Sequence, residues 1–195
     1  TVPKYSVTYH AKTTAESLQD GSLRELRRNQ YEGLVAAGLR KQLSVMREPE
    51  RIQWIGELFR KIARAEEKPT DVTVQGLNPD APNLVLAATV VHKKPYDLAD
   101  GQHHQSLDWA LLESLASLYV KERKHHPLHI LGVRVVSDYT LIGAVRDQAI
   151  PNAPLTQSGQ FGRFSRDFKD GRMHSVLQVP RQVISIANVA RFTEF

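Results

Sequence analysis

The stretch that most constrains the fold of this chain covers residues 83–138 and reads strand, polar loop, helix, strand. The apolar run from Leu84 to Val91 is rich in β-branched residues and predicts a buried strand. A second run, Leu128 to Val136, predicts another strand, and residues 106–124 predict a helix that is apolar nearly all round. This order is that of a βαβ unit, so the two strands are expected to lie parallel in one sheet.

The loop of this unit carries the most concentrated candidate chemistry, Asp100-Gly101-Gln102-His103-His104. Ligands usually bind beyond the carboxyl end of a strand, and the free amides at a helix start favour an anion. Asp100 and His103 are the candidate catalytic or metal-binding pair. The candidate phosphate contacts are Gly101, Gln102 and His104. The structural alternative is a tight turn capped by Asp100 and Gln102, with the histidines exposed.

Six of the eight histidines lie between His92 and His129, in groups on either side of the expected helix. About 20 helical residues at about 1.5 Å each would separate the groups by about 30 Å. Zinc requires its ligands at about 2 Å, so one metal site cannot use both groups if the helix exists. A divalent metal is therefore a candidate cofactor at Asp100 and His103. The second group is explained by the helix dipole.

The amino-terminal third predicts a short strand followed by two helices. Residues Tyr5 to His10 alternate as in a half-buried strand. A helix is expected from about Ser22, where leucines are interspersed with arginines. A second helix opens at Pro49 and places apolar side chains at helical spacing. The helical part is thus expected over about residues 14–68.

The remaining residues, about 70–195, predict a mostly β part that contains the central helix at about 106–124. The polar stretch from Arg146 to Gly171 predicts a long loop, a feature that is often functional. Asp170-Gly171 predicts a two-residue hairpin turn, followed by closing strands. The whole chain, residues 1–195, therefore predicts a single α+β domain: a mixed β-sheet of five to seven strands packed by two N-terminal helices and one long central helix.

Charge indicates an anionic partner. The 195 residues carry a formal net charge of +5, which favours nucleic acid, nucleotides or acidic surfaces. The chain has no cysteine, which excludes disulfides, thiolate catalysis and cysteine-ligated metals and fits a cytoplasmic protein. No apolar run approaches the roughly 18 residues that span a membrane, so no membrane association is expected.

A second candidate site interleaves aromatic rings with cations in the predicted long loop. Single-stranded nucleic acid is bound by this combination, because rings stack on bases and cations meet phosphates. The candidate nucleic-acid-binding residues are Arg163, Phe164, Arg166, Lys169 and Arg172. In the alternative, the phenylalanines pack on the core while the cations face water.

The segment PYDLADGQHHQSLDWALLES, followed by HPLHILGVRVV, resembles the strand, D-G-x-H-R loop, helix and strand of the ParB/sulfiredoxin-like superfamily, in particular its ParB-like nucleases. The resemblance covers residues 94–136 and includes Asp100, Gly101 and His103. His104 stands where an arginine is often found, and the catalytic cysteine of sulfiredoxin has no counterpart. The resemblance implies a phosphate site at this loop and a protein that binds nucleotides or DNA.

These observations predict a soluble basic protein that binds nucleotide or nucleic-acid phosphates through residues 100–104. If it is an enzyme, a phosphoester hydrolase of the nuclease type is expected. The alternative is a non-enzymatic assembly or scaffold protein with incidental histidines. A further resemblance gives a third class: YSVTYHAKT and VLQVPRQVISIANV are similar to the opening and end of ADP-ribosyltransferase toxins. That resemblance implies that His10 and Thr13 hold NAD, although Gln178 stands near the place of the family's catalytic glutamate.

Overall fold

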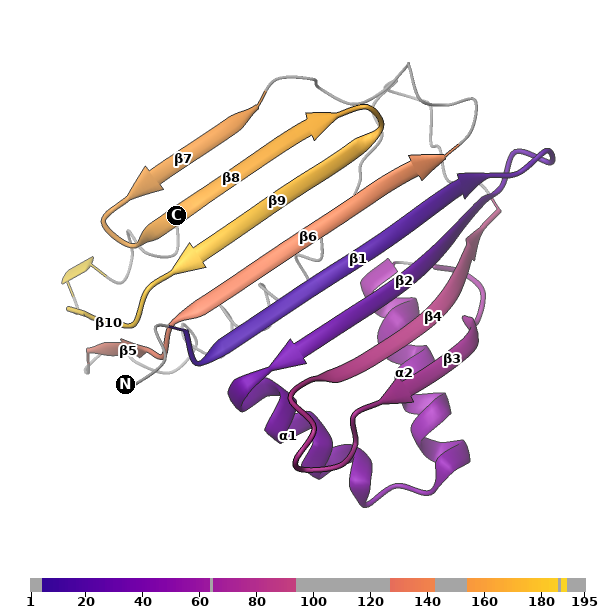
Figure 1. Ribbon diagram of the computed structural model, residues 1–195, viewed down its shortest axis with the longest axis horizontal. Helices are drawn as coiled ribbons and strands as arrows, with labels where there is room; N and C mark the ends of the chain where they lie inside the picture. The colour runs from indigo at the N-terminus through magenta and orange to yellow at the C-terminus, as the bar shows by residue number, and fades with distance from the viewer. Residues whose placement is uncertain (1–4, 64, 94–126, 143–153, 186, 189–195) are drawn as a thin grey trace.

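The chain forms one α+β domain, seen here in a computed structural model (Figure 1). The structure describes residues 5–63, 65–93, 127–142, 154–185 and 187–188. Within these ranges, two helices pack against part of one face of an eight-stranded mixed sheet. The expected fold class is confirmed, with more strands than expected in the sheet. None of the described helices has the length and apolar character needed to cross a membrane.

The large sheet has the spatial strand order β3-β4-β2-β1-β6-β9-β8-β7. All neighbours are antiparallel except β1 and β6, which run parallel at the centre. The strands are β1 (Val7–Ser17), β2 (Leu23–Glu32), β3 (Thr70–Gln75), β4 (Leu84–His92), β6 (Val133–Ile142), β7 (Leu155–Gly159), β8 (Gly162–Lys169) and β9 (Arg172–Val179). The short strands β5 (Leu128–Ile130) and β10 (Gln182–Ile184) form a second, antiparallel sheet.

The strands of the expected βαβ unit are β4 and β6, and they do run parallel in one sheet. This follows because β4 and β2 are antiparallel, β2 and β1 are antiparallel, and β1 and β6 are parallel. They are not neighbours, however, since β2 and β1 lie between them. The 100–104 loop and the helix expected at 106–124 lie outside the described residues.

The single strand predicted over residues 128–136 is two strands. Gly132, with a φ of +84°, separates β5 from β6, a backbone geometry that side chains rarely adopt. Its carbonyl accepts hydrogen bonds at 3.1 Å from the backbone N–H groups of Ser6 and Val7. β6 then continues to Ile142 and carries Asp138 into the middle of the large sheet.

The helix predicted from Ser22 is wrong over residues 23–32, which form β2. The buried side chains of this strand are Leu23, Glu25, Arg27, Asn29 and Tyr31. Polar residues at buried positions hide the period of two by which a half-buried strand is identified in a sequence. The helical part therefore begins only at Gly33, whose φ of +64° leads from β2 into α1 (Gly33–Ser44).

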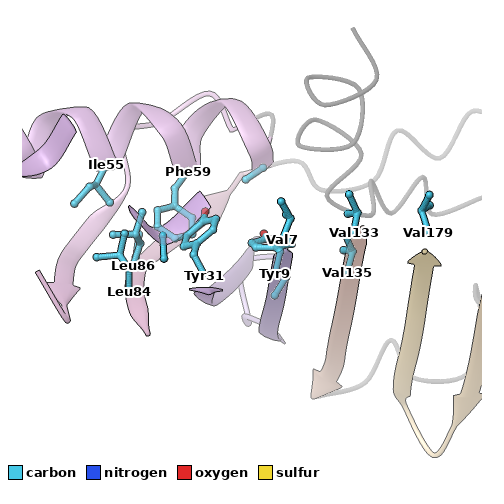
Figure 2. Packing of buried hydrophobic residues seen from close by; sticks show 14 of the residues in the cluster. Val7, Tyr9, Tyr31, Ile55, Phe59, Leu84, Leu86, Val133, Val135 and Val179 are labelled. Carbon is cyan, nitrogen blue, oxygen red and sulfur yellow. The ribbon is translucent and has the colours of Figure 1, made fainter. Parts of the chain in front are cut away.

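The hydrophobic core lies on the side of the sheet that the two helices cover, partly beneath them, and it continues to Val133 and Val135 of β6 and Val179 of β9 (Figure 2). α1 contacts β1 and β2, whereas α2 (Glu48–Ala63) contacts β3 and β4. Ile55 and Phe59 of α2 are fully buried in the same cluster as Leu84 and Leu86 of β4. The apolar spacing that predicted this helix is confirmed.

The long loop predicted up to Gly171 is wrong over residues 155–169, which form β7 and β8. Every residue of β7 is exposed at the sheet edge, so no apolar alternation marks it in the sequence. The hairpin turn at Asp170-Gly171 is confirmed, with φ of +52° and +74°, and it joins β8 to β9. Residues 146–153 lie outside the described ranges.

Candidate functional site

The two faces of the large sheet differ in what covers them. The odd-numbered residues of β1, such as Val7 and Tyr9, belong to the core on the side of α1 and α2. Because side chains alternate along a strand, His10 and Lys12 point to the other side. We call this other side the open face; it carries the even-numbered residues of β1, β2, β6 and β9 and the odd-numbered residues of β8. Figure 1 looks onto this face, and neither helix crosses it.

A His-Asp-His cluster lies at the middle of the open face, across β1, β6 and β9. Nε2 of His10 lies 2.6 Å from Oδ2 of Asp138, and Nδ1 of His174 lies 2.6 Å from Oδ1 of the same carboxylate. His174 is directly opposite Asp138 in the β6–β9 ladder, and His10 reaches it diagonally from β1. One carboxylate therefore holds two imidazoles that are far apart in the chain.

These hydrogen bonds fix which ring nitrogen of each imidazole is available. An ionised carboxylate only accepts hydrogen bonds, so Nε2 of His10 and Nδ1 of His174 each donate an N–H to Asp138. Nδ1 of His10 and Nε2 of His174 are then acceptors when the rings are neutral and donors when they are protonated. The His10 side chain is 41% exposed and that of His174 is 55% exposed, so a ligand on the open face has access to both.

The carboxylate of the cluster is held in its ionised form. Partial burial alone would raise the pKa of Asp138. The hydrogen bonds and charges of His174 and His10 outweigh that effect and lower the pKa below its usual value. Asp138 therefore keeps a negative charge that orients both rings and stabilises either one when it is protonated.

Cations flank the cluster on both sides. Arg28, Lys12, Asp138, His174 and Asp167 form one cross-strand row from β2 to β8. A neighbouring row places Arg172 of β9 opposite Lys169 of β8. Lys12, Arg28, Lys169 and Arg172 are all exposed, and within the described part of the chain none of them forms an ion pair. The cationic charge is thus available to an anionic ligand.

A depression in the open face begins at His174. It lies over the ends of β6, β8 and β9 near the Asp170-Gly171 turn. Its lining residues are Thr140, Ile142, Asp167, Lys169, Asp170, Arg172 and His174. The depression combines one apolar side chain, a hydroxyl, two carboxylates and two cations beside an imidazole, a mixture that suits a sugar or a base next to a phosphate.

The predicted nucleic-acid-binding residues divide between the faces. Arg163, Lys169 and Arg172 lie on the open face, and Lys169 and Arg172 line the depression. Phe164 and Arg166 alternate with them and point to the face of the helices. The five predicted residues therefore do not form one surface: Phe164 and Arg166 share the face of the helices, whereas Arg163, Lys169 and Arg172 share the open face. The cations remain part of the candidate site.

The histidines of the cluster are the two that lie outside the histidine-rich stretch of the sequence. His10 and Asp138 are 128 residues apart, and Asp138 and His174 are 36 residues apart. Only the strand order β1-β6-β9 brings them together. No local motif signals such a cluster, so sequence reasoning missed it. The residues predicted for the site, Asp100, Gly101, Gln102, His103 and His104, lie outside the described ranges.

The toxin resemblance implies that His10 and Thr13 hold NAD together, but these two side chains do not share a surface. His10 is on the open face, whereas Thr13, an odd number of residues further along β1, is buried on the side of the helices. Strand alternation places their side chains on opposite sides of the sheet. His10 and Thr13 therefore do not line one NAD site.

A second polar cluster is buried on the side of the helices, centred on Glu25. Nε of Arg27 donates to Glu25 at 2.7 Å, and Nε2 of His92 lies 3.1 Å from the same oxygen. The hydroxyl of Tyr139 lies 3.5 Å from the other oxygen. Burial alone would raise the pKa of Glu25, but the hydrogen bond from His92 and the charge and hydrogen bond of Arg27 lower it to about 2. The cluster joins β2, β4 and β6, and its role is structural.

Acid should destabilise the protein through Glu25. Its folded pKa of about 2 is below the usual glutamate value of 4.5, so its contribution is complete above pH 4.5 and is lost as the pH falls toward 2. The expected loss in the free energy of unfolding is on the order of 3 kcal/mol. Urea unfolding at pH 6, 4, 3 and 2 measures it, with Glu25→Gln as control. An equally steep acid loss in that variant would contradict this assignment.

The described ranges contain no site to which a metal ion can be assigned. There, no group of three or more histidine, aspartate or glutamate side chains is arranged to hold a metal ion. The divalent metal considered for Asp100 and His103 concerns residues outside these ranges.

No protein-family model, curated protein or solved structure matches the chain. The function is therefore argued from the open face itself.

Proposed function

We propose that the protein binds nucleic-acid phosphates on the open face and cleaves phosphoesters there by general acid–base catalysis, in the cytoplasm. The observation that carries this proposal is the His10–Asp138–His174 cluster, with both hydrogen bonds at 2.6 Å, on a face that carries cations with no ion pair to any residue that the structure describes. The net charge of +5 supports an anionic partner. We thus retain the predicted function, a phosphate-binding phosphoester hydrolase, and propose this cluster as its catalytic site.

The roles follow from the geometry. His10 and His174 are the catalytic residues, since one neutral imidazole can accept a proton while the other, protonated, donates one. Asp138 is a positioning residue that fixes the tautomer and direction of both rings. Lys12 and Arg172 lie on either side and supply charge to the phosphate oxygens.

Binding should depend on the cations of the open face. Lys12→Ala and Arg172→Ala should each weaken binding of a fluorescent single-stranded oligonucleotide. Each should also reduce the slope of log Kd against log salt by about 0.7, the loss of one phosphate contact to a single strand. Fluorescence anisotropy across a salt series measures both quantities.

Lys61→Ala is the matched control, because Lys61 is exposed on α2, away from the open face. It should leave the affinity and the salt slope unchanged. The proposal fails if Lys61→Ala weakens binding as much as Lys12→Ala does, or if neither open-face variant changes the salt slope. The histidines would then be incidental, as in the scaffold alternative.

A further inference from the structure

The His10–Asp138–His174 cluster can transfer protons, but it contains no group that would act as the nucleophile. Each imidazole is anchored by Asp138, and that carboxylate accepts a hydrogen bond on each oxygen. Among the described residues, no serine or threonine hydroxyl is hydrogen-bonded to His10 or His174. A substrate that carries its own nucleophile next to the phosphate would complete this arrangement.

The spread of cations favours a polymer over a mononucleotide. Arg28 and Lys12 lie on β2 and β1, and Lys169 and Arg172 lie on β8 and β9, with the cluster between them. Neighbouring strands are about 4.8 Å apart, so Arg28 on β2 and Lys169 on β8 are separated by about 19 Å across the sheet. One phosphate cannot reach cations at both ends, whereas successive phosphates of a strand can.

On these observations, and resting on the proposed function, we propose that the substrate is single-stranded RNA and that its 2′-hydroxyl is the nucleophile. The 2′-oxygen attacks the adjacent phosphorus, a bond forms between them, and the bond from phosphorus to the 5′-oxygen breaks. The 2′-hydroxyl proton passes to the neutral imidazole of the His10–His174 pair. The protonated imidazole gives its proton to the departing 5′-oxygen, so the products are a 2′,3′-cyclic phosphate and a 5′-hydroxyl.

The shared carboxylate suits this step. One imidazole gains a proton as the other loses one, so the total charge of His10, Asp138 and His174 is the same before and after the step. Asp138 contacts both rings at 2.6 Å and stabilises whichever ring is protonated. One carboxylate therefore serves both rings, and the step needs no second one.

The depression beside His174 gives the flanking nucleoside a place. Thr140 and Asp167 can hydrogen-bond to a ribose or base edge, and Ile142 offers an apolar contact. Ile142 is 44% exposed, which leaves its side chain accessible. The scissile phosphate would then lie at the rim of the depression, within reach of the free nitrogen of His174.

Three oligonucleotides of one sequence test the inference: RNA, DNA, and DNA with a single ribonucleotide. Because binding rests on the phosphate backbone, the three should bind with Kd values within about threefold. The RNA should be cut, the chimera should be cut only on the 3′ side of its ribonucleotide, and the DNA should stay intact. Mass spectrometry should identify 2′,3′-cyclic phosphate ends. His10→Asn, purified in parallel, should cut the RNA at least about 10²-fold more slowly, which excludes a contaminating ribonuclease.

The outcomes separate this inference from the proposed function. If the DNA is cut as fast as the RNA, or if the products carry 5′-phosphates, the 2′-hydroxyl is not the nucleophile, and the inference fails while phosphoester cleavage on the open face stands. Binding of all three strands without cleavage of any would overturn both the inference and the proposed phosphoester cleavage, and would leave only phosphate binding on the open face. If none of the strands binds, the proposed function itself fails.

Discussion

His10→Asn and His174→Asn are each expected to lower the rate of oligonucleotide cleavage by about 10²–10⁴-fold, because each removes one partner in proton transfer. Stability should change little, since both side chains are about half exposed. Because the two imidazoles act as a unit, the double variant should be about as slow as the slower single variant. Single-turnover cleavage assays measure the rates, and thermal unfolding of each variant measures its stability.

His129→Asn is the control for this prediction. His129 is exposed on β5, in the separate two-stranded sheet, and its replacement should leave the cleavage rate unchanged. Multiplicative losses in the double variant would mean that the histidines act independently. If His129→Asn lost as much activity as the other two variants, their losses would not show that His10 and His174 are catalytic.

Glu25→Ala should be the most destabilising single change in the buried polar cluster. It removes the carboxylate that Arg27 and His92 share, and Arg27 is only 7% exposed. Breaking a buried ion pair by removing one partner costs about 3–5 kcal/mol, because the remaining charge stays in a poorly solvated place. Chemical denaturation at pH 7 measures the loss.

Glu16→Ala is the matched control, since Glu16 of β1 pairs with Arg24 of β2 on the open face. Both side chains of that pair are nearly half exposed, so its loss should cost at most about 1 kcal/mol. If the two glutamate variants were equally stable, the cluster around Glu25 would not hold the sheet together.

The parts of the fold that sequence predicted are those with a clear local period. Ile55 and Phe59 mark α2 through their helical spacing, and the apolar run of β4 marks a buried strand. The Asp170-Gly171 turn was predictable because few other pairs adopt two positive φ values so readily. These signals depend on residues that are close together in the chain.

The parts that sequence did not predict depend on polar residues at buried or edge positions. β2 buries Glu25, Arg27 and Asn29, which reads as a polar helix rather than as a strand. β7 buries nothing and reads as a loop. An error of this kind changes the strand count and hides which side chains share a face.

The candidate site was the least predictable feature, because it exists only in the sheet order. His10, Asp138 and His174 are single polar residues in three strands, and each could equally be a surface residue of an ordinary strand. Their meeting depends on the parallel pairing of β1 with β6 and the antiparallel pairing of β6 with β9. Neither pairing is visible in a single sequence.

The most direct test of the central claim is a titration of the wild-type protein with inorganic phosphate, followed by the imidazole ¹H–¹⁵N signals of its histidines. We expect the signals of His10 and His174 to shift together and saturate with one Kd, while those of His129 stay in place. We also expect the shifts to become smaller in Arg172→Ala. If the His129 signal moves as much, or if those of His10 and His174 do not move, the phosphate site is not on the open face.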